Sequence, residues 1–185
     1  MSKLRKMLSY SLSSDDIKLY LPNVPILEYK DLANYQTIQS LLPDQNCSVI
    51  ILIETASKTG HWCSLSRRGN TLIWFDSYGL DIDSEFRYIP IKIQITLHES
   101  RKYLTHLVDN SDFNLVYNGY KLQSRKSYVS TCGRFVVLWL MKFNEGYDLE
   151  RFYEYLDFMA DQLNVKGPLK YDLVVLNQIS FSPDN

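Results

Sequence analysis

Cysteine is scarce in this 185-residue chain, which contains only Cys47, Cys63 and Cys132. Three cysteines cannot all pair within one chain, and none stands in a C-x-x-C motif or at the spacing of a Cys/His zinc site. The pattern argues against a disulfide framework and against a cysteine-based metal centre. It is typical of a reducing compartment, and it leaves at least one free thiol to be explained.

Long apolar runs and an excess of one charge are also lacking. The longest apolar run, residues 135–141, is far too short to span a membrane. The N-terminal segment is too short and too polar for a secretory signal. With 20 Lys and Arg against 21 Asp and Glu, the net charge of −1 argues against a nucleic-acid-binding domain. We expect a soluble intracellular protein that is monomeric and has no membrane partner.

Aromatic side chains are abundant, with 14 Tyr, 8 Phe and 3 Trp. Together with 45% hydrophobic residues, they are enough to fill the core of one domain of this length. No internal repeat and no linker rich in Pro, Gly or Ser divides the chain, so residues 1–185 are predicted to form a single domain. The first ten residues have no clear apolar face and are expected to be loose.

Apolar periodicity and capping residues predict both helices and strands. Helices are expected at 15–21 after a cap at Ser13 or Ser14, at 31–42 after a cap at Asp31, at 97–108, at 132–143, and at 149–163 after a cap at Asp148. Strands are expected at 48–54, 61–66, 71–76, 113–117 and 171–176. The pattern predicts an α+β fold, in which helices flank a central mixed or antiparallel sheet and residues 132–143 form a buried helix.

Two consecutive predicted strands form a hairpin that brings His61 and Asp76 together. A two-residue turn at Arg68-Gly69 places them directly opposite each other, whereas a turn at Gly69-Asn70 makes them diagonal neighbours on one face. A three-residue loop without a bulge would separate them. A carboxylate beside an imidazole fixes its tautomer and stabilises the imidazolium. The alternative is that the two residues stand at strand ends by chance.

Cys132 precedes an apolar run and is therefore expected at or near the N-terminus of a helix. The helix dipole and the backbone N–H groups at that end favour a thiolate. Gly133 lets another chain approach the backbone closely. The alternative is a small buried side chain, which is the usual role of an unpaired cysteine. We expect that structural role for Cys63, which alternates inward in its strand, and for Cys47.

Gln123 stands nine residues before Cys132. Its amide can donate to a developing oxyanion together with the backbone N–H of Cys132. Taken alone, a glutamine in a polar stretch is more often a surface residue. Trp62 either packs on the neighbouring imidazole or belongs to the core, and the sequence does not separate these two roles.

The candidate residues follow the order His, Asp, Gln, Cys, whereas papain-like enzymes place the cysteine first. In this order the chain resembles the adenovirus-protease and SUMO-protease superfamily, in particular the compact maturation proteases of virophages and polinton-type elements. The resemblance rests on four stretches: Gly60-His61-Trp62, Trp74-Phe75-Asp76-Ser77-Tyr78-Gly79, Leu122-Gln123-Ser124 and Ser130-Thr131-Cys132-Gly133-Arg134-Phe135. The nine-residue spacing from the glutamine to the cysteine is longer than in several members.

The resemblance implies a cysteine-protease fold with the nucleophile at the N-terminus of the buried helix. It implies that Cys132 is the nucleophile, His61 the general base, Asp76 the acid that orients His61, and Gln123 the oxyanion-hole donor. The implied reaction is acyl transfer, which needs no metal or organic cofactor. The implied function is cleavage of capsid or other virion precursor proteins during maturation, in the host cytoplasm, the viral factory or the virion.

Two other functions stay open on this fold. An isopeptidase that removes ubiquitin-like proteins would use the same triad, although the chain looks too short for the extended surface that such a substrate needs. A non-catalytic binding module would be favoured only if His61 or Cys132 were missing. A nucleic-acid or peptide activator is also open, and the near-neutral charge argues against strong binding of nucleic acid.

Overall fold

The computed structural model describes residues 2–181, which form two compact units. The sheet unit consists of residues 24–119, and the helical unit takes its residues from 1–23 and 120–185. Both contain clusters of buried apolar side chains. The single domain expected from the sequence stays a prediction.

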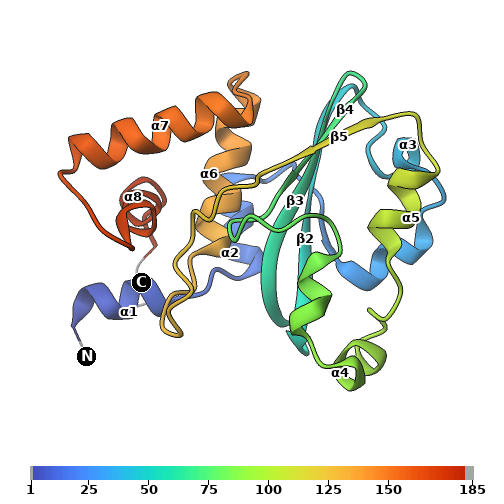
Figure 1. The fold of residues 1–185 in the computed structure, drawn as a ribbon, viewed down its shortest axis with the longest axis horizontal. Coiled ribbons are helices and arrows are strands. Elements are labelled where there is room, and N and C mark those ends of the chain that lie inside the picture. The colour runs from blue at the N-terminus through green and yellow to red at the C-terminus, as the bar shows by residue number, and fades with distance from the viewer. Residues whose placement is uncertain (1, 182–185) are drawn as a thin grey trace. The chain divides into compact units, whose positions relative to one another are not determined.

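The sheet unit is built on a five-stranded sheet whose strands lie in chain order (Figure 1). The strands are β1 (Ile26–Glu28), β2 (Asn46–Ala56), β3 (Thr59–Arg68), β4 (Thr71–Phe75) and β5 (Asn114–Tyr117). The two outer pairs are parallel and the two inner pairs antiparallel. The helical segments are η1 (Tyr29–Asn34), α3 (Ile38–Leu41), η2 (Ser84–Tyr88), α4 (Ile91–Thr96) and α5 (Tyr103–Asp109). The predicted α+β class with a mixed sheet and flanking helices is confirmed.

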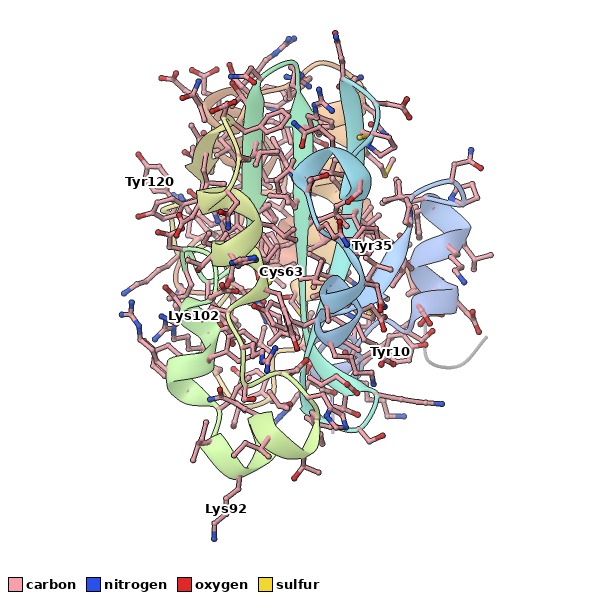
Figure 2. All side chains as sticks on the ribbon, turned by 90° about the vertical axis from the view of Figure 1, so that its right-hand side faces the viewer. Tyr10, Tyr35, Cys63, Lys92, Lys102 and Tyr120 are labelled. Atoms are coloured by element: carbon pink, nitrogen blue, oxygen red, sulfur yellow. The ribbon has the colours of Figure 1, made fainter. Side chains whose placement is uncertain are left out.

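One face of this sheet is covered by η1, α3 and α5, the face toward the viewer in Figure 2. Because side chains alternate along a strand, Ile51 and Ile53 of β2 share this face with Cys63 and Leu65 of β3. They pack against apolar side chains of the covering segments, among them Leu32, Ile38, Leu41, Leu104 and Leu107. Over residues 49–54, β2 is buried on both faces, as its continuous apolar run predicts.

The hairpin between β3 and β4 determines which side chains meet at its open end. Arg68 pairs with Thr71 across a two-residue turn at Gly69-Asn70. The other predicted register, with the turn one residue earlier, is wrong. In the observed register Asp76, just after the last pair of the ladder, is a diagonal neighbour of His61 on the same face.

The helical unit contains α1 (Lys3–Ser9), α2 (Ser14–Tyr20), α6 (Cys132–Asn144), α7 (Leu149–Gln162) and α8 (Lys170–Gln178). As its apolar sequence predicts, α6 is buried along most of its length. It packs against α2 and α8, and α8 also packs against α1 and α7. The predicted caps are present: Ser13 Oγ accepts the N–H of Asp16 at 3.2 Å, and Asp148 Oδ1 accepts that of Arg151 at 2.8 Å. No helix within residues 2–181 is long and apolar enough to cross a membrane.

The predicted helix over residues 31–42 is wrong. The chain forms η1 and then the separate helix α3, because Thr37 caps α3 by accepting the N–H of Ser40 at 3.1 Å. Asp31 does not begin a helix. It lies inside η1, and its carboxylate accepts the backbone N–H of Glu28 at 3.0 Å.

The predicted helix over residues 97–108 begins only at Tyr103. Residues 97–102 belong to no helix, and the preceding helix, α4, ends at Thr96. His98 then has a φ of 60°, a left-handed conformation that a right-handed helix cannot continue through. Apolar periodicity does not reveal this break, because the break depends on the local backbone conformation at His98.

Both ends of the chain also differ from expectation. Residues 171–176, predicted as a strand from their β-branched pair, lie in α8, where tertiary contacts outweigh local propensity. Residues 3–9, expected to be loose, form α1, whose Leu8 is buried with Val129 and Leu176. Leu8, with Met7 packed against the same cluster, thus anchors a helix that has no continuous apolar face.

Gly60 is tightly enclosed in the turn end of the β2–β3 hairpin. A Cβ atom there would lie 1.9 Å from the carbonyl oxygen of Ile53 and 2.7 Å from Cα of Glu54, both backbone atoms. We expect Gly60→Ala to lower the free energy of unfolding by about 1–3 kcal/mol or more, because the hairpin must shift to admit the methyl group. Urea unfolding measures this change. Gly119→Ala is the control, since its Cβ would have no neighbour nearer than 4.0 Å; equal stability of the two variants would contradict the enclosure of Gly60.

Candidate active site

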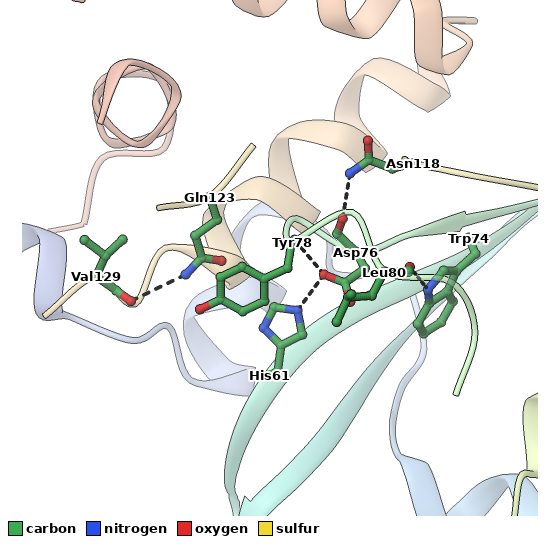
Figure 3. A network of polar contacts seen from close by, with 8 residues as sticks. All are labelled: His61, Trp74, Asp76, Tyr78, Leu80, Asn118, Gln123 and Val129. Carbon is green, nitrogen blue, oxygen red and sulfur yellow. Dashed lines mark hydrogen bonds and ion pairs between the residues drawn. The ribbon is translucent and has the colours of Figure 1, made fainter. Parts of the chain in front are cut away.

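His61 and Asp76 form a buried pair at the open end of the β3–β4 hairpin (Figure 3). Nε2 of His61 lies 3.0 Å from Oδ1 of Asp76, and the two residues are 6% and 1% exposed. The predicted proximity is confirmed. A carboxylate only accepts hydrogen bonds, so Nε2 carries the hydrogen of this contact. Nδ1 is then the basic nitrogen of the neutral ring.

The loop after β4 holds the carboxylate of Asp76 in place. Its Oδ1 also accepts the backbone N–H of Tyr78 at 2.7 Å, and its own carbonyl accepts the N–H of Gly79 at 2.9 Å. Gly79 has a φ of 73°, which this tight turn requires and which glycine adopts without strain. The side chain of Asn118, fully buried, donates to the carbonyl of Asp76 at 2.6 Å. The Asp-Ser-Tyr-Gly sequence is therefore a turn that orients the acid.

An aromatic ring lies against the imidazole of His61, and it belongs to Tyr78. The two ring centroids are 4.7 Å apart and the ring planes differ by 19°. Trp62 follows His61 on β3, so its side chain points to the opposite face of the sheet, where it is buried. Of the two roles considered for Trp62, the structure favours the core. The residue that stacks on His61 is instead Tyr78, which lies in the Asp76-Ser77-Tyr78-Gly79 stretch, and the sequence did not predict this role.

Cys63 lies beside this pair and packs in the core, as predicted, with no exposed surface. Burial raises the pKa of its thiol, the charge of Asp76 raises it further, and His61 opposes both. Within residues 2–181, the one group of three side chains able to converge on a metal ion is His61, Cys63 and Asp76, with ligand atoms within 4.8 Å of one another. The hydrogen bond between His61 and Asp76 by itself explains why two of these three side chains lie close together. The absence of a cofactor stays a prediction.

Cys132 is the first residue of α6 and is 5% exposed, so its predicted place at a helix N-terminus is confirmed. A helix N-terminus carries partial positive charge and backbone N–H groups that the helix itself does not satisfy. Thr131, the preceding residue, does not cap these groups with its side chain. Its hydroxyl donates instead to Oδ1 of Asp172 at 2.5 Å. The helix start is thus suited to stabilise negative charge.

A buried cation lies two residues after Cys132 on the same helix. Arg134 has no exposed surface, and its guanidinium donates to the carbonyls of Tyr10 at 2.7 Å and Ile179 at 3.4 Å. Burial lowers the pKa of Arg134, and the negative charge of a Cys132 thiolate would favour its charged form. By the same attraction the guanidinium favours the thiolate.

Gln123 is buried rather than a surface residue, at 4% exposure. Its Nε2 donates to the carbonyl of Val129 at 3.4 Å, which fixes the orientation of the amide group (Figure 3). An amide nitrogen carries two hydrogens, and this contact engages one of them. Because the amide group is planar, the direction of the second N–H bond is then fixed as well. Gln123 and Cys132 belong to the helical unit, whereas His61 and Asp76 belong to the sheet unit.

Three supporting residues were missed by the sequence analysis: Tyr78, Asn118 and Asp172. Tyr78 stands in the motif, and its position two residues after an aspartate is a signal for a turn in which the carboxylate caps the backbone. Asn118 and Asp172 act over 42 and 41 residues of sequence, respectively, on Asp76 and Thr131. A single sequence carries no signal for such contacts.

Two buried carboxyl groups lie near the turn that precedes His61. Glu54 and Glu99 are each 1% exposed, and Oε1 of Glu99 accepts the backbone N–H of Glu54 at 2.9 Å. Glu54 in turn accepts the backbone N–H of Lys58 and lies 3.6 Å from the ammonium of Lys30. The second carboxylate oxygen of each glutamate has no hydrogen-bond partner within the described chain. Burial raises the pKa of Glu99 to about 7, and the charge of Glu54 adds to the effect.

Because its pKa is raised on folding, Glu99 binds its proton more tightly in the folded state than in the unfolded one. We therefore expect the free energy of unfolding to fall as the pH rises from about 4.5 to 7, by as much as about 3 kcal/mol from this group. Glu99→Gln should make that slope shallower, measured by urea unfolding at several pH values. Glu145→Gln, at an exposed glutamate, is the control. An unchanged slope in Glu99→Gln would contradict the raised pKa.

Comparison with known proteins places the chain among virophage proteins. No protein-family model matches it. Over 167 residues it is 33% identical to the uncharacterized protein V9 of Sputnik virophage, a match that covers 89% of this chain and 94% of that protein. The match therefore includes residues of both the sheet unit and the helical unit, and the expected virophage relation is confirmed. The chain belongs to the family of virophage proteins that includes protein V9 of Sputnik virophage.

Proposed function

We propose that this chain is a cysteine endopeptidase that cleaves capsid or other virion precursor proteins through a triad of Cys132, His61 and Asp76. The observation that supports it most directly is the buried hydrogen bond between His61 and Asp76. The position of Cys132 at the start of a buried helix supports it further. The virophage relative supports a viral setting, such as the viral factory or the virion.

The proposed reaction is acyl transfer. It requires the two units to bring the Cys132 thiol to Nδ1 of His61, which takes the thiol proton while Asp76 stabilises the imidazolium. The thiolate attacks a peptide carbonyl, and the carbon–nitrogen bond breaks as His61 returns the proton to the leaving amine. Water, deprotonated by His61, then releases the acyl group and restores the thiol.

The oxyanion of each tetrahedral intermediate needs donors that are already oriented. Gln123 offers its side-chain amide, and Cys132 offers its backbone N–H at the helix start. Both donors belong to the helical unit, so the nucleophile and the oxyanion hole share one scaffold. The base and its orienting acid share the other.

A pairing of Cys132 with His61 has a direct chemical signature. We expect iodoacetamide to alkylate Cys132 rapidly at pH 6 and His61→Ala to slow this reaction by about tenfold or more, because the mutant lacks the base that holds the thiolate. Peptide mass mapping separates the three cysteines, and Asp76→Asn should lie between wild type and His61→Ala. His106→Ala, at an exposed histidine of α5, is the matched control. Equal alkylation of Cys132 in wild type and His61→Ala would count against the triad.

Cleavage itself is tested with the capsid precursors encoded by the same viral genome. We expect the wild-type chain to convert them to shorter products and Cys132→Ala to be inactive but folded, since the change removes one sulfur atom. Cys47→Ala is the control with an intact nucleophile. Ubiquitin and SUMO conjugates that carry a fluorophore are tested in parallel, and their cleavage in place of the precursors would identify an isopeptidase instead. Residual cleavage by Cys132→Ala would reject Cys132 as the nucleophile.

A further inference from the structure

Asp172 is a buried acid to which the proposed reaction assigns no role. It lies in the first turn of α8, has no exposed surface, and uses both carboxylate oxygens. Oδ1 accepts the hydroxyl hydrogen of Thr131 at 2.5 Å, and Oδ2 accepts the backbone N–H of Ser124 at 3.0 Å. One carboxylate therefore joins two segments that are far from α8 in the sequence.

Each of these donors is adjacent to a group of the proposed site. Thr131 immediately precedes Cys132, and Ser124 immediately follows Gln123. The amide of Gln123 also donates to the carbonyl of Val129, within the same loop. The loop from residue 123 to residue 131 is thus closed by three hydrogen bonds, two of which end on Asp172. All of these residues lie in the helical unit.

The carboxylate of Asp172 is explained by the two hydrogen bonds that it accepts. Among the described residues, no lysine, arginine or histidine forms an ion pair with Asp172, and burial raises the pKa of Asp172 to about 6. A buried carboxylate without a cation is costly, so packing alone would favour an apolar or amide side chain. The two donors reach different oxygens of Asp172, so one carboxylate accepts a charge-assisted hydrogen bond from each of two segments.

We propose that Asp172 is a positioning residue that holds the Gln123 segment against the start of α6, so that both oxyanion donors face the same point. This role rests on the proposed protease function. Asp172 touches neither the substrate nor the thiol in this role; it sets the distance between two groups that do. A displacement of about 1 Å between such groups is enough to lower a rate about 100-fold.

Thr131→Val removes the hydroxyl donor, and Asp172→Asn puts an NH2 group in place of one acceptor oxygen and removes the charge from both contacts, each with little change in shape. We expect both to lower kcat about 10- to 100-fold on a fluorogenic peptide that spans the cleaved precursor site, with KM changed less than about threefold. Thr131→Ser keeps the hydroxyl and should restore activity. Asp161→Asn, at an exposed aspartate of α7, should match wild type. Combining Asp172→Asn with Thr131→Val should cost no more than the worse of the two single changes, because both break one link.

A second readout separates positioning from general damage to the nucleophile. Alkylation of Cys132 by iodoacetamide needs no oxyanion hole, so its rate in Asp172→Asn should stay within about threefold of wild type. An unchanged kcat in Asp172→Asn, or alkylation that falls in proportion to kcat, would overturn the role. If Asp172→Asn does not fold, the Thr131→Val and Thr131→Ser pair decides, and equal loss in both would overturn it. Failure of the protease function itself is distinct, because the wild-type chain would then cleave no precursor.

Discussion

The hydrogen bond between His61 and Asp76 depends on the turn at Gly69-Asn70, eight residues after His61 and six before Asp76. Only a two-residue turn at Gly69-Asn70 makes these residues diagonal neighbours, and a change of one residue in loop length would send their side chains to opposite faces. The β3–β4 ladder continues this register from Arg68–Thr71 to Ser64–Phe75. The strand register thus determines that the imidazole of His61 and the carboxylate of Asp76 lie on the same face.

The helical unit provides a helix start, at Cys132, where negative charge is favoured. Its central helix is apolar along most of its length, yet it begins with a thiol and buries a guanidinium in its first turn. Negative charge at this helix start is favoured by the helix dipole and by Arg134. Asp172 also lies close to this helix start, through its hydrogen bond with Thr131, and its negative charge opposes a thiolate there.

Local signals in the sequence predicted the parts of this arrangement that depend on neighbouring residues. The continuous run of β2, the cap at Asp148 and the apolar helix after Cys132 are all visible in short windows, and the structure confirms them. For the β3–β4 hairpin, the sequence left open two two-residue turns that share Gly69 and a three-residue loop, and the structure has the turn at Gly69-Asn70. The predicted strand at 171–176 was wrong, because adjacent valines favour a strand locally while α8 satisfies contacts with distant segments. Asn118 and Asp172 were missed for the same reason: their partners are more than 40 residues away.

Arg134 links the two ends of the chain to the helix that carries Cys132. Its guanidinium donates to a carbonyl at residue 10 and to another at residue 179, so each terminal segment supplies an acceptor to one buried cation. Trimming either segment would leave a guanidinium N–H without its acceptor inside the protein, at a cost of about 1–3 kcal/mol or more. The terminal segments are therefore part of the packing around the helix that begins with Cys132. Proteolytic cleavage or ligand binding at either end would therefore change the structure around the Cys132 thiol.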